Sequence, residues 1–107
     1  MSTQRYAGPV LRAGEVADAV VEAIREDNAD KPIVVDQHAS YVRVKVAGDC
    51  VIRRETVERH LGRTFQLREL EIHMPSFAGY IRTGTDMVRF VLGSTTPAAA
   101  AASGSSP

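Results

Sequence analysis

The sequence of 107 residues has one cysteine, six aromatic side chains and no long apolar run. A lone cysteine, Cys50, cannot form an intramolecular disulfide, which is typical of a protein from a reducing cytoplasm. Because a transmembrane helix needs about 20 consecutive apolar residues, no membrane span is expected. The N-terminal segment MSTQRYAG lacks the hydrophobic stretch of a secretory signal peptide. These absences predict a cytoplasmic protein that does not enter a membrane.

The chain also lacks an excess of either charge. Thirteen basic and thirteen acidic residues cancel, so no overall attraction to nucleic acid or to a membrane surface is expected. The charges are unevenly spread, since residues 13–36 hold seven acidic against two basic side chains and residues 43–68 hold seven basic against three acidic ones. This distribution is typical of a protein that orients a partner electrostatically, and equally of ordinary solvated faces.

No pattern of a catalytic or metal site is present. The three histidines do not have the spacing of a helical zinc site, and a single cysteine excludes an iron–sulfur protein. Ser76 lies in Pro-Ser-Phe-Ala-Gly and not in a G-x-S-x-G elbow. The aspartates of residues 27–36 lack the spacing and the glycine of a calcium loop. The sequence therefore predicts no catalytic residue, no cofactor site and no metal site.

The first half of the chain predicts the order β-α-β-β. Pro9–Leu11 is a short expected strand, and Glu15–Glu26 is an expected helix because apolar side chains recur at every fourth position from Val16. Strands are expected at Ile33–Val35 and at Tyr41–Val46, where the alternating valines face inward.

The second half predicts a strand, helical segments and a hairpin. Val51–Ile52 is an expected short strand, and a helix over Arg54–His60 is expected to end at Gly62. Helical turns over 65–70, with Thr64 as N-cap, run into a helical pattern that covers Leu67–Ile72.

Residues 77–92 predict a β-hairpin. Side chains alternate over 77–82 and again over 88–92, and Thr-Gly-Thr-Asp at 83–86 supplies the turn. The mid-strand Gly79 indicates a place where another backbone comes close.

These elements predict a compact single α+β domain of two β-α-β-β-like halves with mainly antiparallel strands. The folded domain is expected to cover residues 8–92, after a flexible lead at 1–7. Residues 93–107 are uncharged Ser, Thr, Ala, Gly and Pro, and this tail is expected to be disordered because it cannot bury enough apolar surface.

Four pieces in order carry a family resemblance: Gly8–Gly14, Tyr41–Val44, Leu61–Phe65 and Ser76–Gly79. Together they resemble the effector proteins, also called coupling or regulatory proteins, of soluble diiron monooxygenases. The likeness covers roughly residues 8–92 and is strongest to the toluene and aromatic monooxygenase branch. No single motif is specific, so the ordered set is what carries it.

The resemblance implies a regulatory component that has no cofactor and no catalytic activity of its own. Such a protein binds a diiron hydroxylase, remodels its active site and couples the use of NADH-derived electrons to hydroxylation. It shares its docking surface on the hydroxylase with a Rieske-type ferredoxin.

The resemblance also implies which residues contact the hydroxylase. The linker and strand start press on it, and the outward side chains of the hairpin lie on the same interface: His73, Met74, Pro75, Ser76, Phe77, Gly79, Tyr80, Arg82 and Arg89. His73 and Pro75 depart from the family pattern, in which Asn and a small residue are common. A bulky residue at Gly79 is expected to leave the fold intact and to weaken hydroxylase binding. The alternative for Phe77 is a plain core position, and for Gly79 a bulge.

Two other functions compete with this one. A small nucleic-acid-binding α+β domain would use Tyr41, Arg43, Lys45, Arg53 and Arg54, but zero net charge and few aromatic residues oppose it. A small hydrolase or isomerase would require turnover by the isolated protein.

Overall fold

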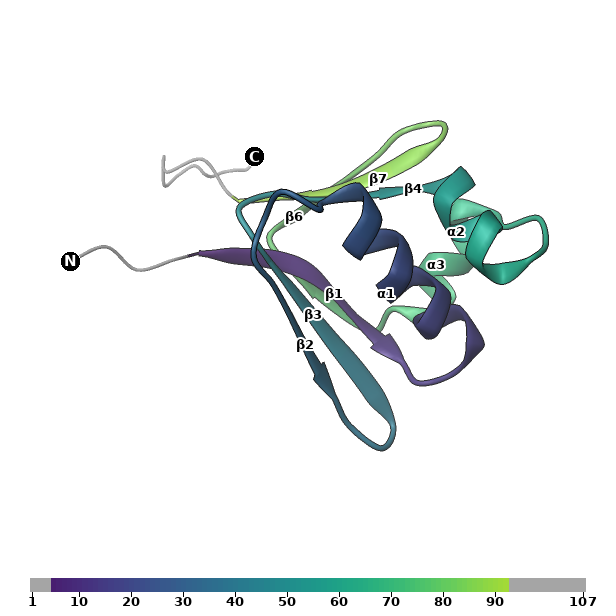
Figure 1. The fold of residues 1–107 in the computed structure, drawn as a ribbon, viewed down its shortest axis with the longest axis horizontal. Coiled ribbons are helices and arrows are strands. Elements are labelled where there is room, and N and C mark those ends of the chain that lie inside the picture. The colour runs from purple at the N-terminus through teal and green to yellow at the C-terminus, as the bar shows by residue number, and fades with distance from the viewer. Residues whose placement is uncertain (1–4, 93–107) are drawn as a thin grey trace.

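The computed structural model describes residues 5–92, which form an α+β fold of two sheets and three helices (Figure 1). Every strand pair within the sheets is antiparallel, as predicted. The elements follow one another as β1 (Tyr6–Arg12), α1 (Glu15–Asp27), β2 (Ile33–Gln37), β3 (Tyr41–Ala47), β4 (Cys50–Arg53), α2 (Arg54–Leu61), α3 (Leu67–His73), β5 (Ser76–Ala78), β6 (Tyr80–Thr83) and β7 (Met87–Val91). The predicted disordered tail lies outside the described residues.

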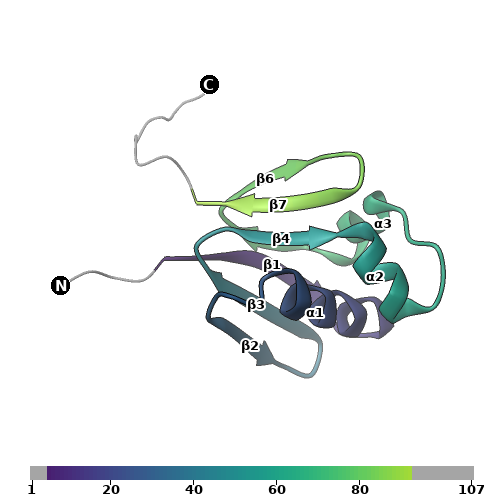
Figure 2. The ribbon, with the colours of Figure 1, turned by 45° about the horizontal axis from the view of Figure 1, so that its top comes forward.

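The seven strands divide into a four-stranded sheet of order β2-β3-β1-β5 and a three-stranded sheet of order β4-β7-β6. Figures 1 and 2 show the two sheets diverging from the end where the described chain begins and stops, with the helices in the opening between them. Helix α1 packs against α2 and β4 there. One face of each sheet therefore supports the core, and the other face is left without a helix.

The core forms where the periodicity predicts it. Val42, Val44 and Val46 are buried along β3, and α1 buries the side that carries Val20 and Ile24. Larger side chains from the second half complete the core, among them Phe65, Leu70 and Phe90. Alternation in strands and a four-residue repeat in helices are thus confirmed as the signals of burial.

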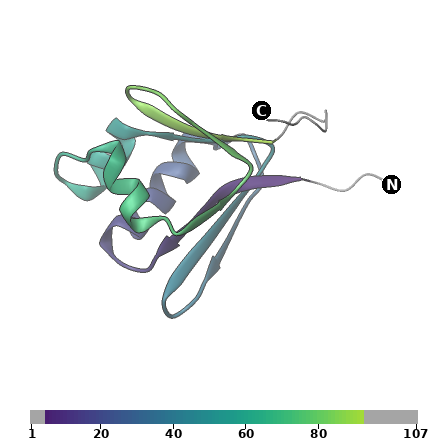
Figure 3. The same cartoon turned by 180° about the vertical axis from the view of Figure 1, so that it is seen from behind.

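One expected strand is in fact two. Residues 77–82 were expected to form one arm of a hairpin, but β5 pairs with β1 in the four-stranded sheet and β6 pairs with β7 in the three-stranded sheet. Figure 3 shows this stretch, after α3, crossing from one sheet to the other. Gly79 lies at the crossing with φ of 100°, a conformation that glycine adopts readily and that strains a residue with a side chain.

Gly79 does mark a close backbone approach, but the approaching backbone belongs to the same chain. A Cβ atom at this position would lie 2.7 Å from the carbonyl oxygen of Val91 and 3.2 Å from the Cβ of Ala7. The expectation that a bulky residue at Gly79 would leave the fold intact is therefore wrong. The glycine is required where β1, β6 and β7 meet.

Two further boundaries differ from the prediction. Strand β1 begins at Tyr6, and Ala7 is fully buried, so the expected flexible lead is wrong for these two residues. Helix α3 is capped by Gln66 and not by Thr64, because Gln66 and Glu69 form a reciprocal capping box. The predicted end of α2 is confirmed, since Gly62 takes the left-handed conformation of a C-cap.

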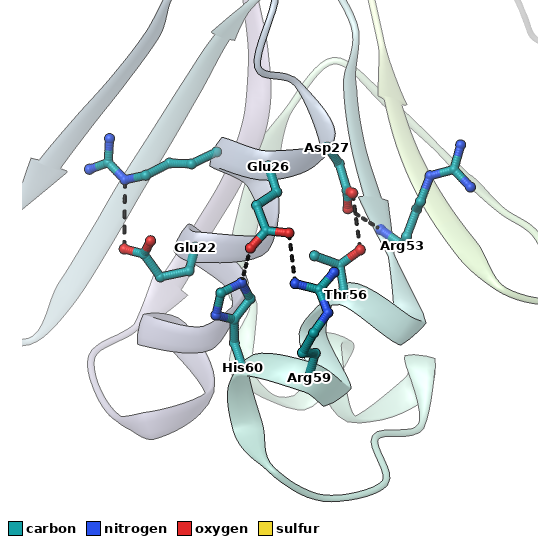
Figure 4. A network of polar contacts seen from close by, with 8 residues as sticks. Glu22, Glu26, Asp27, Arg53, Thr56, Arg59 and His60 are labelled. Atoms are coloured by element: carbon teal, nitrogen blue, oxygen red, sulfur yellow. Dashed lines mark hydrogen bonds and ion pairs between the residues drawn. The ribbon is translucent and has the colours of Figure 1, made fainter.

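A polar network joins α1 to β4 and α2 (Figure 4). Glu26 accepts a hydrogen bond of 2.8 Å from Arg59, and its other oxygen lies 2.5 Å from Nε2 of His60. Asp27 accepts bonds from the backbone N–H of Arg53 and from the hydroxyl of Thr56. The hydrogen bonds from Arg59 and His60 lower the pKa of Glu26. These contacts give His60 a structural role in tying α1 to α2.

We expect Cys50 to resist alkylation in the folded protein. Its thiol is fully buried on β4, and burial raises its pKa to about 12, so the reactive thiolate is scarce at pH 8. Iodoacetamide labelling followed by mass spectrometry should be slow in native buffer and fast in urea. Equal rates in the two solutions would contradict the burial.

Candidate partner-binding surface

The structure divides the predicted interface residues between two places. His73 to Phe77 form the end of α3, the linker and the start of β5, whereas Tyr80, Arg82 and Arg89 lie on the outer face of the hairpin formed by β6 and β7. Met74 is buried in the core, so its side chain does not lie on the surface that a partner would meet.

The linker presents a small and mostly exposed surface. Pro75 and Ser76 are exposed, and His73 is half-buried at the end of α3. The ring of Phe77 is tilted against the buried ring of Phe90, with 5.5 Å between centroids, yet the residue remains 39% exposed. Phe77 is therefore partly a packing residue and partly a surface one, between the two alternatives that the sequence left open.

Sequence reasoning missed Ile72, which is 69% exposed next to the linker. Leu70 is buried on the same helix, and a residue two positions further lies on the opposite side of a helix of 3.6 residues per turn. The spacing of two residues between Leu70 and Ile72 was the sequence signal that could have predicted this exposure. Ile72 is therefore an exposed apolar side chain near the end of α3.

A furrow runs over the outer face of the four-stranded sheet beside the linker. Gly8 pairs with Ala78 and Val10 with Ser76, so the floor between β1 and β5 is made of short side chains. Two adjoining depressions, of about 330 and 380 Å³, share Val10, Arg43 and Ser76 in their walls. The furrow is shallow and open, and it suits contact with a partner surface better than enclosure of a substrate.

The hairpin presents a second surface, on the outer face of the three-stranded sheet. Tyr80 is 61% exposed there, and Arg82 lies directly opposite Arg89 in the pairing of β6 with β7. A depression of about 210 Å³ lies between the two strands, lined by Arg82, Thr83, Gly84, Met87 and Arg89. Exposed tyrosine and arginine side chains are the types that most often anchor protein interfaces.

The residues of the nucleic-acid alternative do not share one surface. Arg43 and Lys45 lie on β3 in the four-stranded sheet, where Lys45 is 3.6 Å from Asp36. Arg53 lies at the end of β4 in the other sheet, and Arg54 begins α2 with its guanidinium 2.9 Å from Asp86. A single basic platform for a nucleic-acid strand is therefore not formed by this set.

Within residues 5–92 no cluster of three or more histidine, cysteine or carboxylate side chains could hold a metal ion. In the same part of the chain no helix is long and apolar enough to cross a membrane. The surfaces described above can bind, orient and press on another macromolecule.

Comparison with known proteins matches almost the whole described chain. Residues 5–91 match the model of the MmoB/DmpM family. The chain is 38% identical over 87 residues to the effector subunit of the alkene monooxygenase system of Xanthobacter autotrophicus strain Py2, covering 81% of this chain and 86% of the relative. It is 38% identical over 73 residues to DmpM, the stimulatory component of phenol 2-monooxygenase from Pseudomonas sp. strain CF600, covering 68% and 77% of the two chains.

Solved structures with the same fold come from two phenol hydroxylase–regulatory protein complexes. A chain of the first superimposes with a TM-score of 0.67 at 27% identity, covering 82% of this chain and 98% of that one. A chain of the second gives a TM-score of 0.67 at 26% identity, covering 81% and 99%. In both cases the similarity covers more than four fifths of this chain.

Proposed function

The chain belongs to the MmoB/DmpM family, the effector proteins of soluble diiron monooxygenases, and from that premise we propose that it binds the hydroxylase of such a system and remodels its active site. The observation that carries this proposal is the extent of the family match. It covers residues 5–91, which is nearly all of the described domain. The protein acts as a regulatory component, and the chemistry takes place on its partner.

The action of such an effector has a simple thermodynamic form. It must bind one conformation of the hydroxylase more tightly than another, because a ligand with equal affinity for both shifts nothing. A nearly complete switch between two conformations needs a preference of about 10⁴-fold. Docking that moves helices beside the diiron centre would change the access of oxygen and substrate, and so couple NADH-derived electrons to hydroxylation.

The interface that we propose contains the linker and the hairpin. Pro75, Ser76 and the exposed part of Phe77 offer a surface of low side chains at the edge of one sheet, and Tyr80 begins the neighbouring strand of the other. His73 lies beside the linker at the end of α3, Arg82 and Arg89 lie on the second surface, the outer face of the hairpin, and Gly79 sets the crossing between the sheets. The electron-transfer protein, a Rieske-type ferredoxin, would use the same surface of the hydroxylase in alternation.

The substrate belongs to the hydroxylase pocket and not to this chain. The relatives described above come from alkene and phenol systems, and the toluene-type assignment stays a prediction. An aromatic hydrocarbon or an alkene is the substrate class that we propose for the complete enzyme.

Binding tests this proposal without any assay of turnover. The protein should co-elute with its diiron hydroxylase in size-exclusion chromatography, and Tyr80→Ala should weaken the affinity by about tenfold or more, as for an aromatic interface anchor. Val34→Ala is the control, because Val34 is exposed on β2 at the far edge of the other sheet. Failure of the wild-type protein to bind the hydroxylase would overturn the proposed function.

A further inference from the structure

Three arginines gather on the outer face of the three-stranded sheet. Directly opposed residues of an antiparallel pair point to the same side, so Arg82 and Arg89 share this face. On the other flank of β7, Val51 of β4 lies opposite Arg89, and Arg53 lies two residues further on the same side. We call Arg53, Arg82 and Arg89 the arginine face.

The positive charge of the arginine face is not neutralised within the described chain. Strands β4, β6 and β7 contain no acidic residue, and within residues 5–92 none of these three guanidinium groups forms an ion pair. Five basic residues elsewhere have carboxylate partners, namely Arg25, Lys45, Arg54, Arg59 and Arg63, whereas Arg12, Lys31, Arg43 and Arg68 form no ion pair within residues 5–92. What sets the arginine face apart is the cross-strand pair of Arg82 and Arg89.

This arrangement opposes folding. Like charges directly across an antiparallel pair repel each other, and Arg82 and Arg89 hold that relation in the centre of the hairpin. No contact within the described domain offsets this repulsion. An external anion lying over the face would offset it, since carboxylates accept paired hydrogen bonds from guanidinium groups.

We propose that the arginine face docks a cluster of carboxylate side chains on the hydroxylase surface. This inference rests on the proposed function and adds the chemistry of recognition to it. The depression between Arg82 and Arg89 is a seat for one carboxylate, and Arg53 extends the positive field beyond it. Exposed Tyr80 lies at the end of the same face and supplies an uncharged contact. The charges also speed the encounter with an acidic surface.

The substitution Arg82→Glu separates docking from a structural role of Arg82. If Arg82 serves docking, hydroxylase affinity falls while Tm stays the same or rises; if it stabilises the fold, Tm falls. A glutamate opposite Arg89 replaces a repulsive cross-strand pair with an attractive one, so Tm should stay the same or rise. Affinity for the hydroxylase at low salt should fall by about tenfold or more, mainly through slower association. The association rate of the variant should depend less on salt concentration than the association rate of the wild type.

Arg25→Glu is the matched control. It makes the same change in net charge at an exposed position on α1, outside the arginine face, and should leave hydroxylase affinity nearly unchanged. Surface plasmon resonance from low to high salt measures all three proteins against immobilised hydroxylase.

The outcomes distinguish this inference from the function on which it rests. If wild-type protein and Arg82→Glu bind the hydroxylase with equal affinity and equal salt dependence, the arginine face is not the docking site, although the proposed function stands. If Arg82→Glu changes only self-association or binding to a DNA duplex, the face belongs to a second copy or to nucleic acid, and the inference is overturned. If the wild-type protein binds no hydroxylase at any salt concentration, the proposed function itself fails.

Discussion

Gly79→Val is expected to lower the free energy of unfolding by about 3–5 kcal/mol, from a strained positive φ and from steric overlap together. The backbone of Gly79 has φ of 100°, which a β-branched residue rarely adopts. The new Cβ would lie 2.7 Å from the carbonyl oxygen of Val91, a contact that the surrounding sheet cannot relieve without moving backbone. Urea unfolding followed by circular dichroism measures the loss.

Gly84→Ala is the matched control for this change. A Cβ atom at Gly84 would lie 3.5 Å from the carbonyl oxygen of Met87, which is an ordinary van der Waals contact. Its stability should stay within about 1 kcal/mol of the wild type, the usual cost of a surface turn substitution. A Gly79→Val protein that unfolds at the same urea concentration as the wild type would contradict the crossing between the two sheets at this residue.

Asn28→Ala is expected to cost about 2–4 kcal/mol, because the partly buried N–H and carbonyl oxygen of Val51 lose the side chain that they bond. Asn28 is 1% exposed at the end of α1. Its amide group donates to the carbonyl oxygens of Ile24 and Val51, at 2.9 and 2.8 Å, and its own oxygen accepts from the N–H of Val51 at 2.9 Å. The side chain thus joins α1 to the strand that carries Arg53.

Thermal unfolding measures this loss, and Asp30→Ala is the control because Asp30 is exposed in the same turn. The control should melt within a degree or two of the wild type. If Asn28→Ala also melts within a degree or two of the wild type, water replaces the lost hydrogen bonds, and the link between α1 and β4 contributes little to stability.

The elements that the sequence predicted well are those with strong local signals. Helix α1 and strand β3 were predicted because apolar side chains recur at every fourth position in the first and at every second position in the second. The buried residues of both elements follow these repeats. The cap of α3 was misplaced because Thr64 is the better N-cap residue type. The deciding signal is the reciprocal pair Gln66 and Glu69, for which Thr64 has no equivalent three residues on.

The crossing between sheets could not be read from local pattern. Alternation along residues 77–82 is the same whether they pair with one strand or with two in turn, and the choice of β1 and then β7 is a long-range fact. Gly79 was the one visible clue.

The same limit applies to the candidate surface. Arg82 and Arg89 were named as outward residues of one hairpin, but Arg53 was assigned to a different function because nothing local places β4 beside β7. Met74 was named with its neighbours in the linker, and only tertiary packing shows that it is buried.

The most direct test of the central claim is the rate of product formation by the hydroxylase, with its reductase and ferredoxin present, as this protein is titrated in. We expect a saturable increase in rate and in product formed per NADH consumed, and no product when the hydroxylase is omitted. A rate that does not respond at any concentration of the protein, or product formed by the protein alone, would contradict the account.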